Sequence, residues 1–229
     1  MQTSAAPKKQ ASWQWPVLFV IGLGVAIIVS GMYEPKDQNG LHLIRSPDEY
    51  QTVEKKAFDI YSPIMSTTAF RGGALSAGDM EKLRTATPLF EELCVFEPKK
   101  IGPYVALGEI HYLLGEIPEA ERSFRQAIDV APLTGNDPKY AQLGVAAAQS
   151  GLAKSYLEDH DYRQALASAN DSIKTEPNVP LYYFQRARVC IQLQMVKEAE
   201  ADLKYAIKLQ PDNAEFVRLL RFVEGAAKK

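Results

Sequence analysis

The stretch "GEIPEAERSFRQAIDVAP", from Gly115 to Pro132, carries the pattern on which the prediction of the fold depends. Ala120, Phe124 and Ala127 recur at intervals of four and three, which is typical of one face of an amphipathic helix. Pro132 disfavours any continuation of this helix, because its ring removes a backbone donor and clashes with the preceding turn. The stretch therefore predicts a helix that begins after a glycine and ends near a proline.

Three further stretches have the same pattern, with an alanine twelve residues before a proline. They are "ATPLFEELCVFEP", which ends at Pro98, "DYRQALASANDSIKTEP", which ends at Pro177, and "MVKEAEADLKYAIKLQP", which ends at Pro211. Pro98 and Pro132 are 34 residues apart, as are Pro177 and Pro211, whereas Pro132 and Pro177 are 45 residues apart. A constant period indicates units that stack on their neighbours, so we predict a repeat array with an insertion of 11 residues.

These motifs resemble the tetratricopeptide repeat family, whose 34-residue unit is a pair of antiparallel helices with small residues where they cross. Three units match, over 101–134, 146–179 and 180–213. The matching positions are Leu107, Gly108, Gly115, Ala120, Phe124, Ala127 and Pro132; then Leu152, Ala153, Tyr156, Tyr162, Ala165 and Pro177; then Ala187, Ala199, Leu203, Ala206 and Pro211. The resemblance implies an all-α fold, a solenoid of helical hairpins.

The two ends of the repeat domain, 47–229, differ from the middle. A degenerate unit over 47–100 precedes the three clear repeats, and "FRGGALSAGD" interrupts its first helix. A terminal capping helix over 212–226 has one apolar face and one charged face, as expected of an element that closes a stack of repeats.

The 11-residue insertion predicts a long first helix in the middle unit. Asp137 followed by Pro138 is a helix start signal, so this helix is expected to run from there to about Asp159. Its overhang either packs on the degenerate N-terminal helices or presents Tyr140 and Leu143 as a docking point.

The N-terminal part of the chain differs in composition from the rest. Residues 15–33 contain no charged side chain, and 19 residues of helix span about 28 Å, close to the ~30 Å of a bilayer core. Trp13, Trp15 and Tyr33 lie at the ends, where aromatic rings prefer the headgroup level. The sequence predicts a single transmembrane helix over 15–33; the alternative is a cleaved signal peptide ending near 29–31.

The charges beside this segment predict its orientation. Lys8 and Lys9 lie in the short N-terminal stretch 1–14, whereas the linker 34–46 begins with both acidic and basic residues. The positive-inside rule therefore places the N-terminus in the cytoplasm and the repeat domain across the membrane, in a bacterium the periplasm.

Small residues spaced by four, Gly22, Ala26 and Ser30, would share one face of the predicted helix and allow a second helix to approach. The alternative is that this face has no specific partner.

Composition and motifs argue against several function classes. A net charge of −2 gives no electrostatic basis for nucleic-acid binding. Cys94 and Cys190 match no metal or redox spacing and are expected to be free core residues, and no histidine has a second ligand at metal spacing. We therefore expect no enzyme, no metal, no cofactor and no small-molecule substrate.

The resemblance implies that the first helix of each unit lines a concave face, which would bind an extended or helical segment of a partner protein. The residues so placed are Val105, Glu109, Tyr112, Leu113, Ser150, Lys154, Leu157, Leu181, Phe184, Arg188 and Ile191. An alternative is that the chain's own N-terminal helix or linker fills this face. Relatives that clamp acidic chaperone tails carry Lys, Asn or Arg at positions that here are Val105, Glu109, Leu181 and Gln185, so that clamp is not expected.

The sequence as a whole predicts a membrane-tethered scaffold, assembly factor or accessory subunit that binds subunits of a membrane complex. Two alternatives remain open. The chain is a structural subunit held through its transmembrane helix and convex surface, or it is a cleaved, chaperone-like periplasmic protein.

Overall fold

The computed structural model describes residues 17–21, 24–28, 44–71, 75–133 and 137–226. The chain divides into two compact units, Met1–Leu43 and Ile44–Lys229.

The described residues of the first unit form two short strands, β1 (Val17–Ile21) and β2 (Gly24–Ile28), which pair antiparallel with Phe19 opposite Ala26. The helix predicted over 15–33 is wrong for these residues, and the rest of that range lies outside the described residues. A continuous apolar run suits a buried helix or a strand equally well, and the valines and isoleucines here are β-branched and favour strands. In the part of the chain that the structure describes, no helix has the length and apolar character needed to span a membrane.

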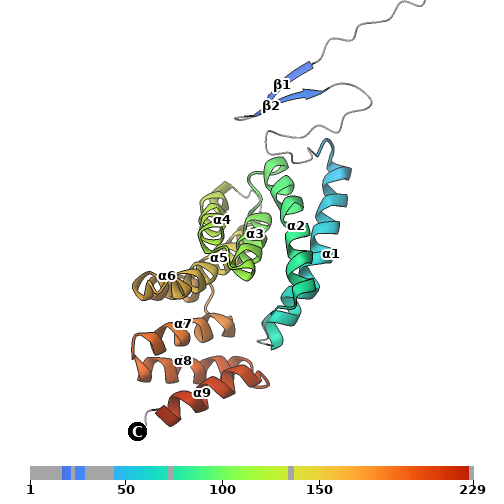
Figure 1. The fold of residues 1–229 in the computed structure, drawn as a ribbon. Helices are drawn as coiled ribbons and strands as arrows, with labels where there is room; N and C mark the ends of the chain where they lie inside the picture. Colours follow the sequence, from blue (N-terminus) through green and yellow to red (C-terminus); the bar gives the residue numbers. More distant parts are fainter. Residues whose placement is uncertain (1–16, 22–23, 29–43, 72–74, 134–136, 227–229) are drawn as a thin grey trace, which may run out of the picture. The chain divides into compact units, whose positions relative to one another are not determined.

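The described residues of the second unit are helical apart from turns, as the sequence predicts (Figure 1). Each helix packs against the next one in the chain. The helices are α1 (Pro47–Arg71), α2 (Ala77–Phe96), α3 (Ile101–Leu114), α4 (Ile117–Val130), the 3-10 turn η1 (Ala131–Leu133), α5 (Pro138–Glu158), α6 (Tyr162–Thr175), α7 (Pro180–Gln192), α8 (Val196–Leu209) and α9 (Ala214–Ala226). The pairs α3/α4, α5/α6 and α7/α8 are the helical hairpins, with α1/α2 before them and α9 after them.

One buried ring joins the first hairpin to the second. Phe124 on α4 is fully buried, and its ring lies between two glycines. A Cβ on Gly108 of α3 would lie 2.5 Å from the ring, and a Cβ on Gly151 of α5 would lie 2.3 Å from it. Because any side chain would collide with the ring, the glycines allow both helix backbones to approach it.

The same place in each hairpin turn has a left-handed backbone. Gly115 ends α3 with φ 79°, and its counterparts His160 and Gln194 have φ 61° and 59°. This conformation closes a helix end and suits glycine, whereas other residues adopt it with strain. The sequence signal for the turn is therefore a glycine in the first unit only.

The overhang of α5 packs on neighbouring helices of the array. The Asp137 carboxylate accepts a hydrogen bond from the Tyr140 backbone at 2.9 Å and caps the helix. Gln142 Nε2 donates to the Thr175 carbonyl at 2.7 Å, and Gly144 lies against Ile101 of α3. The first two turns of α5 are therefore held by α3 and α6. Tyr140 and Leu143 are 39% and 42% exposed, so their role as a docking point stays a prediction.

Replacing Gly151 with alanine should lower the free energy of unfolding by about 1–3 kcal/mol, because the new methyl group would collide with the buried Phe124 ring. Urea unfolding followed by circular dichroism measures the change. Gly78→Ala is the control, since its nearest neighbour is the Ser76 hydroxyl at 3.8 Å. The control should leave stability unchanged or raise it by up to ~1 kcal/mol; equal effects at both sites would contradict the packing role of Gly151.

Replacing Gln194 with glycine should raise the free energy of unfolding by about 1 kcal/mol, because glycine adopts the left-handed backbone without strain. The same unfolding experiment tests it. Gln126→Gly, at an exposed position within α4, should instead cost ~1 kcal/mol. A loss of stability in the Gln194 variant would show that its side chain, not its backbone, matters.

Candidate protein-binding surface

The first helices of successive hairpins also contact one another, α3 with α5 and α5 with α7. Glu109, Lys154 and Arg188 occupy the same place in their units and belong to these three helices. The row formed by the first helices is referred to below as the α3–α5–α7 wall.

The central contact of this wall is a partly buried ion pair. Lys154 Nζ donates to both carboxylate oxygens of Glu109, at 2.8 and 2.7 Å, and the two side chains are only 13% and 17% exposed. The same ammonium lies 4.9 Å from the centre of the Tyr112 ring. Two hydrogen bonds and an aromatic face offset the loss of hydration of the ammonium, so this pair fixes α3 relative to α5.

A more exposed chain of polar contacts continues toward α7. Tyr112 Oη donates to Glu158 at 3.2 Å, and Glu158 lies 3.9 Å from the Arg188 guanidinium. Arg188 Nη1 donates to Gln185 at 3.0 Å. Burial, followed by the charge of Glu158, raises the pKa of Tyr112 to about 12, so the phenol stays protonated and remains a donor at neutral pH.

Two tyrosines that the repeat pattern did not single out lie near Glu109. Burial raises the pKa of Tyr182 on α7 to about 12, and the charges of Glu176 and Glu109 add to the shift. Burial and then Glu109 also raise the pKa of Tyr61 on α1. Tyr61 belongs to the degenerate unit, where the 34-residue register gives no guide to position. Only the fold shows that α1 supplies a group to this region.

The apolar residues predicted for the concave face divide into exposed and buried ones. Leu181 is 38% exposed, at the start of α7. Leu113 and Ile191 are half-buried and pack against the cores around α1/α2 and α8/α9. Leu157 and Phe184 are buried, and the Phe184 ring lies 5.0 Å from that of Phe216 on α9. The structure therefore places Leu157 and Phe184 in the core, where they stabilise the array and are not open to a partner.

The residues predicted to form a helix-packing face lie only partly within the described part of the chain. Ala26 lies in β2, a strand and not the predicted helix, while Gly22 and Ser30 lie outside the described residues. Cys94 and Cys190 are buried free thiols, and burial raises the pKa of both, which keeps them protonated at neutral pH. Over the described ranges, no group of three or more His, Cys, Asp or Glu side chains has a geometry that could hold a metal ion.

Two segments of the chain, 101–132 and 181–213, match the sequence model of the tetratricopeptide repeat. They fall on α3/α4 and α7/α8, the first and third hairpins.

Two curated proteins are similar to parts of the chain. A protein SGT1 homolog of Oryza sativa subsp. japonica is 24% identical over 102 residues, which are 44% of this chain and 25% of that protein. Tetratricopeptide repeat protein 16 of Mus musculus is 25% identical over 116 residues, 51% of this chain and 15% of that protein. The chain thus spans a quarter or less of the length of these relatives.

Solved structures show the same fold at low identity. A MamA RS-1 double mutant is 14% identical with a TM-score of 0.57, over 80% of this chain and 87% of that one. The structure of the APC/C hetero-tetramer Cut9–Hcn1 is 15% identical with a TM-score of 0.58, over 77% of this chain and 32% of that one. Yeast Tom70 is 14% identical with a TM-score of 0.54, over 80% of this chain and 44% of that one. Two segments of the chain thus match the tetratricopeptide repeat, and its described helices form a solenoid of helical hairpins like those of these solved structures.

Proposed function

We propose that this protein is a scaffold that binds a segment of a partner protein along the α3–α5–α7 wall, and that it has no catalytic role. The observation that carries the proposal is the row of side chains that three successive first helices bring to one wall. Tetratricopeptide repeats are protein-binding modules, and grooves of this kind accept extended or helical segments.

The open part of the wall lies toward α7. Glu109 and Lys154 bond to each other and are largely buried. The pair therefore holds α3 against α5 and has little capacity to form hydrogen bonds with a partner protein. Leu181 and Arg188 are 38% and 34% exposed. The guanidinium also interacts with Gln185, Glu158 and Tyr112, and with five N–H groups it keeps donors beyond these contacts. A segment that carries an apolar side chain and a hydrogen-bond acceptor fits this pair of residues.

A photo-crosslinking amino acid at position 181 should give specific adducts with a partner in cells that produce the protein, because this side chain is exposed on the wall. Arg188→Glu should reduce the adduct yield roughly tenfold, since it replaces the donors with a charge of the opposite sign. The readout is immunoblotting followed by mass spectrometry.

The same crosslinker at position 209, an exposed leucine near the end of the second helix α8, is the matched control. Equal adducts from positions 181 and 209, or adducts that Arg188→Glu leaves unchanged, would contradict binding at the wall. Phe184 is unsuitable for this test, because its replacement would remove a core contact with Phe216.

We further propose that the scaffold acts at a membrane, as an assembly factor or accessory subunit of a membrane complex. The support is composition alone: segment 15–33 carries no charged side chain and is preceded by two lysines. If the segment crosses a bilayer, these lysines favour the repeat unit on the far side of the membrane, in a bacterium the periplasm. Attachment would raise the effective concentration of the wall for neighbouring proteins. A structural subunit or a cleaved periplasmic protein are the competing possibilities.

The full chain should remain with membranes after carbonate washing, and Ile27→Arg should move much of it to the soluble fraction. An arginine within an apolar segment costs about 2.5–3.5 kcal/mol on insertion scales. Gln38→Arg, outside the segment, is the control and should change nothing. Release of the unmodified chain, or an intact mass that lacks the first residues, would exclude attachment through this segment.

A further inference from the structure

One face of the last described helix, α9, carries Val217 and Arg221. The corresponding face of each earlier first helix packs against the second helix of its own hairpin. A shift of 34 residues places Val217 and Arg221 of α9 where α7 has Tyr183 and Ala187. In α7 these positions face the second helix of the hairpin: the Tyr183 ring lies 4.5 Å from that of Tyr205 on α8, and Ala187 is fully buried. Among the described helices, none covers the corresponding face of α9.

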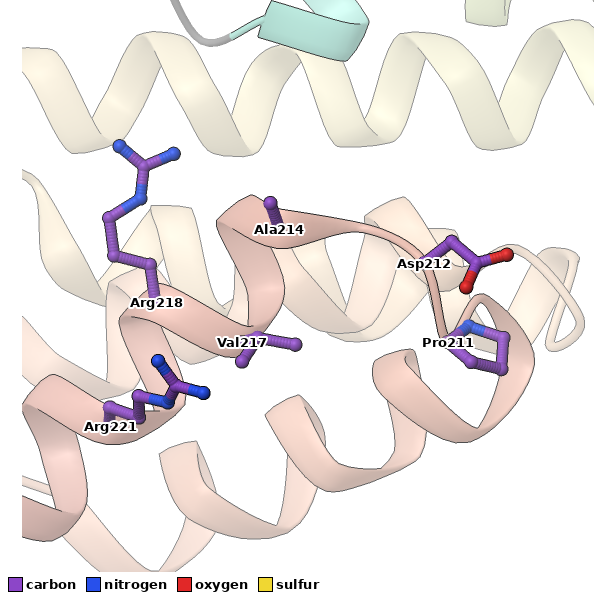
Figure 2. Close-up of a pocket in the computed structure, with 6 residues that line it drawn as sticks. All are labelled: Pro211, Asp212, Ala214, Val217, Arg218 and Arg221. Atoms are coloured by element: carbon purple, nitrogen blue, oxygen red, sulfur yellow. The ribbon is translucent and has the colours of Figure 1, made fainter.

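An open hollow of about 360 Å³ lies on this face (Figure 2). Val217 lies between Arg221 and the turn at Pro211 and Asp212, as the close-up shows. The hollow is lined by Pro211, Asp212, Ala214, Val217, Arg218 and Arg221. It combines an apolar floor with two guanidinium groups and one carboxylate.

The two arginines give the hollow its electrostatic character. Arg218 and Arg221 are both exposed, and neither side chain forms a hydrogen bond or ion pair with another described residue. Even with Asp212 counted, the side chains around the hollow carry an excess positive charge. Charge complementarity therefore selects an occupant with carboxylates.

The residue at position 221 argues against an ordinary repeat helix as the occupant. At this place the three hairpins have Gly108, Ala153 and Ala187, and the small side chain lets the second helix approach closely. The arginine would overpack such an approach unless its guanidinium is drawn outward to an acidic group. An apolar helix of the repeat type does not meet that condition, whereas an acidic amphipathic segment does.

We propose that this hollow is a docking site for an acidic amphipathic segment of a partner protein. Its apolar side chains would cover Val217 and Ala214, and its carboxylates would pair with Arg218 and Arg221. The lining residues of the hollow are separate in sequence from Leu181 and Arg188, so the chain would hold a second partner segment here.

The test uses the full chain in detergent and two fluorescently labelled amphipathic peptides, one with leucine and glutamate and its counterpart with leucine and glutamine. Fluorescence anisotropy should show saturable binding of the glutamate peptide, roughly tenfold tighter than the glutamine peptide and weakened by salt. Arg218→Gln with Arg221→Gln should remove that preference. Arg122→Gln with Arg163→Gln, exposed on α4 and α6, should keep it.

Absence of saturable binding of the glutamate peptide, equal affinity for both peptides, or an equal loss in the two double variants would overturn the proposal. Sedimentation tests the other occupant: a wild-type dimer that the Arg218/Arg221 variant converts to a monomer would assign the face to a second copy instead. Arg188→Glu should leave peptide binding intact, so failure at the wall and failure at α9 are distinguishable.

Discussion

The contact of the Phe124 ring with Gly108 and Gly151 is the constraint on which the array depends. One glycine belongs to the ring's own hairpin and the other to the next hairpin, so a single side chain sets the spacing within a unit and between units. A hairpin of this kind cannot bury its own apolar face, and its stability comes from its neighbours. The later hairpins do not repeat this ring-on-glycine contact. They have Ala169 and Leu203 at the position of Phe124, and Ala153 and Ala187 at the position of Gly108. The contact of one ring with two glycines is thus a feature of the junction between the first and second hairpins.

Close stacking also decides the chemistry of the wall. Because the first helices touch one another, Glu109 and Lys154 meet across units and are shielded from water, while Glu158 and Arg188 meet more loosely. The side chains become more exposed along the row, from a shape-defining ion pair at α3–α5 to the open residues Leu181 and Arg188 at α7. This difference is why the α7 end is the better candidate for partner contacts.

The terminal helix α9 resolves a conflict between packing and solubility. One of its faces must be apolar, since Phe216 completes the core with Phe184, and none of the described helices covers the opposite face. Arginines on that second face are exposed and keep it hydrated. The same charges give the hollow around Val217 a preference for acidic ligands, so the side chains that keep this face hydrated also favour a ligand there.

The sequence by itself determined the helical class, the 34-residue period, the start of α5 at Pro138 and the small residues at the helix crossings, because these depend on local patterns and proline or glycine chemistry. It also placed Glu109, Lys154 and Arg188 on first helices. It failed for Val17–Ile21 and Gly24–Ile28, since an apolar run of β-branched residues fits a helix or a strand equally well. Only the tertiary structure decided that Phe184 and Leu157 are core residues, that Tyr61 approaches Glu109, and that the α5 overhang rests on α3 and α6. Those outcomes depend on contacts between units, and a residue's own periodicity does not show what packs against it from a distant part of the chain.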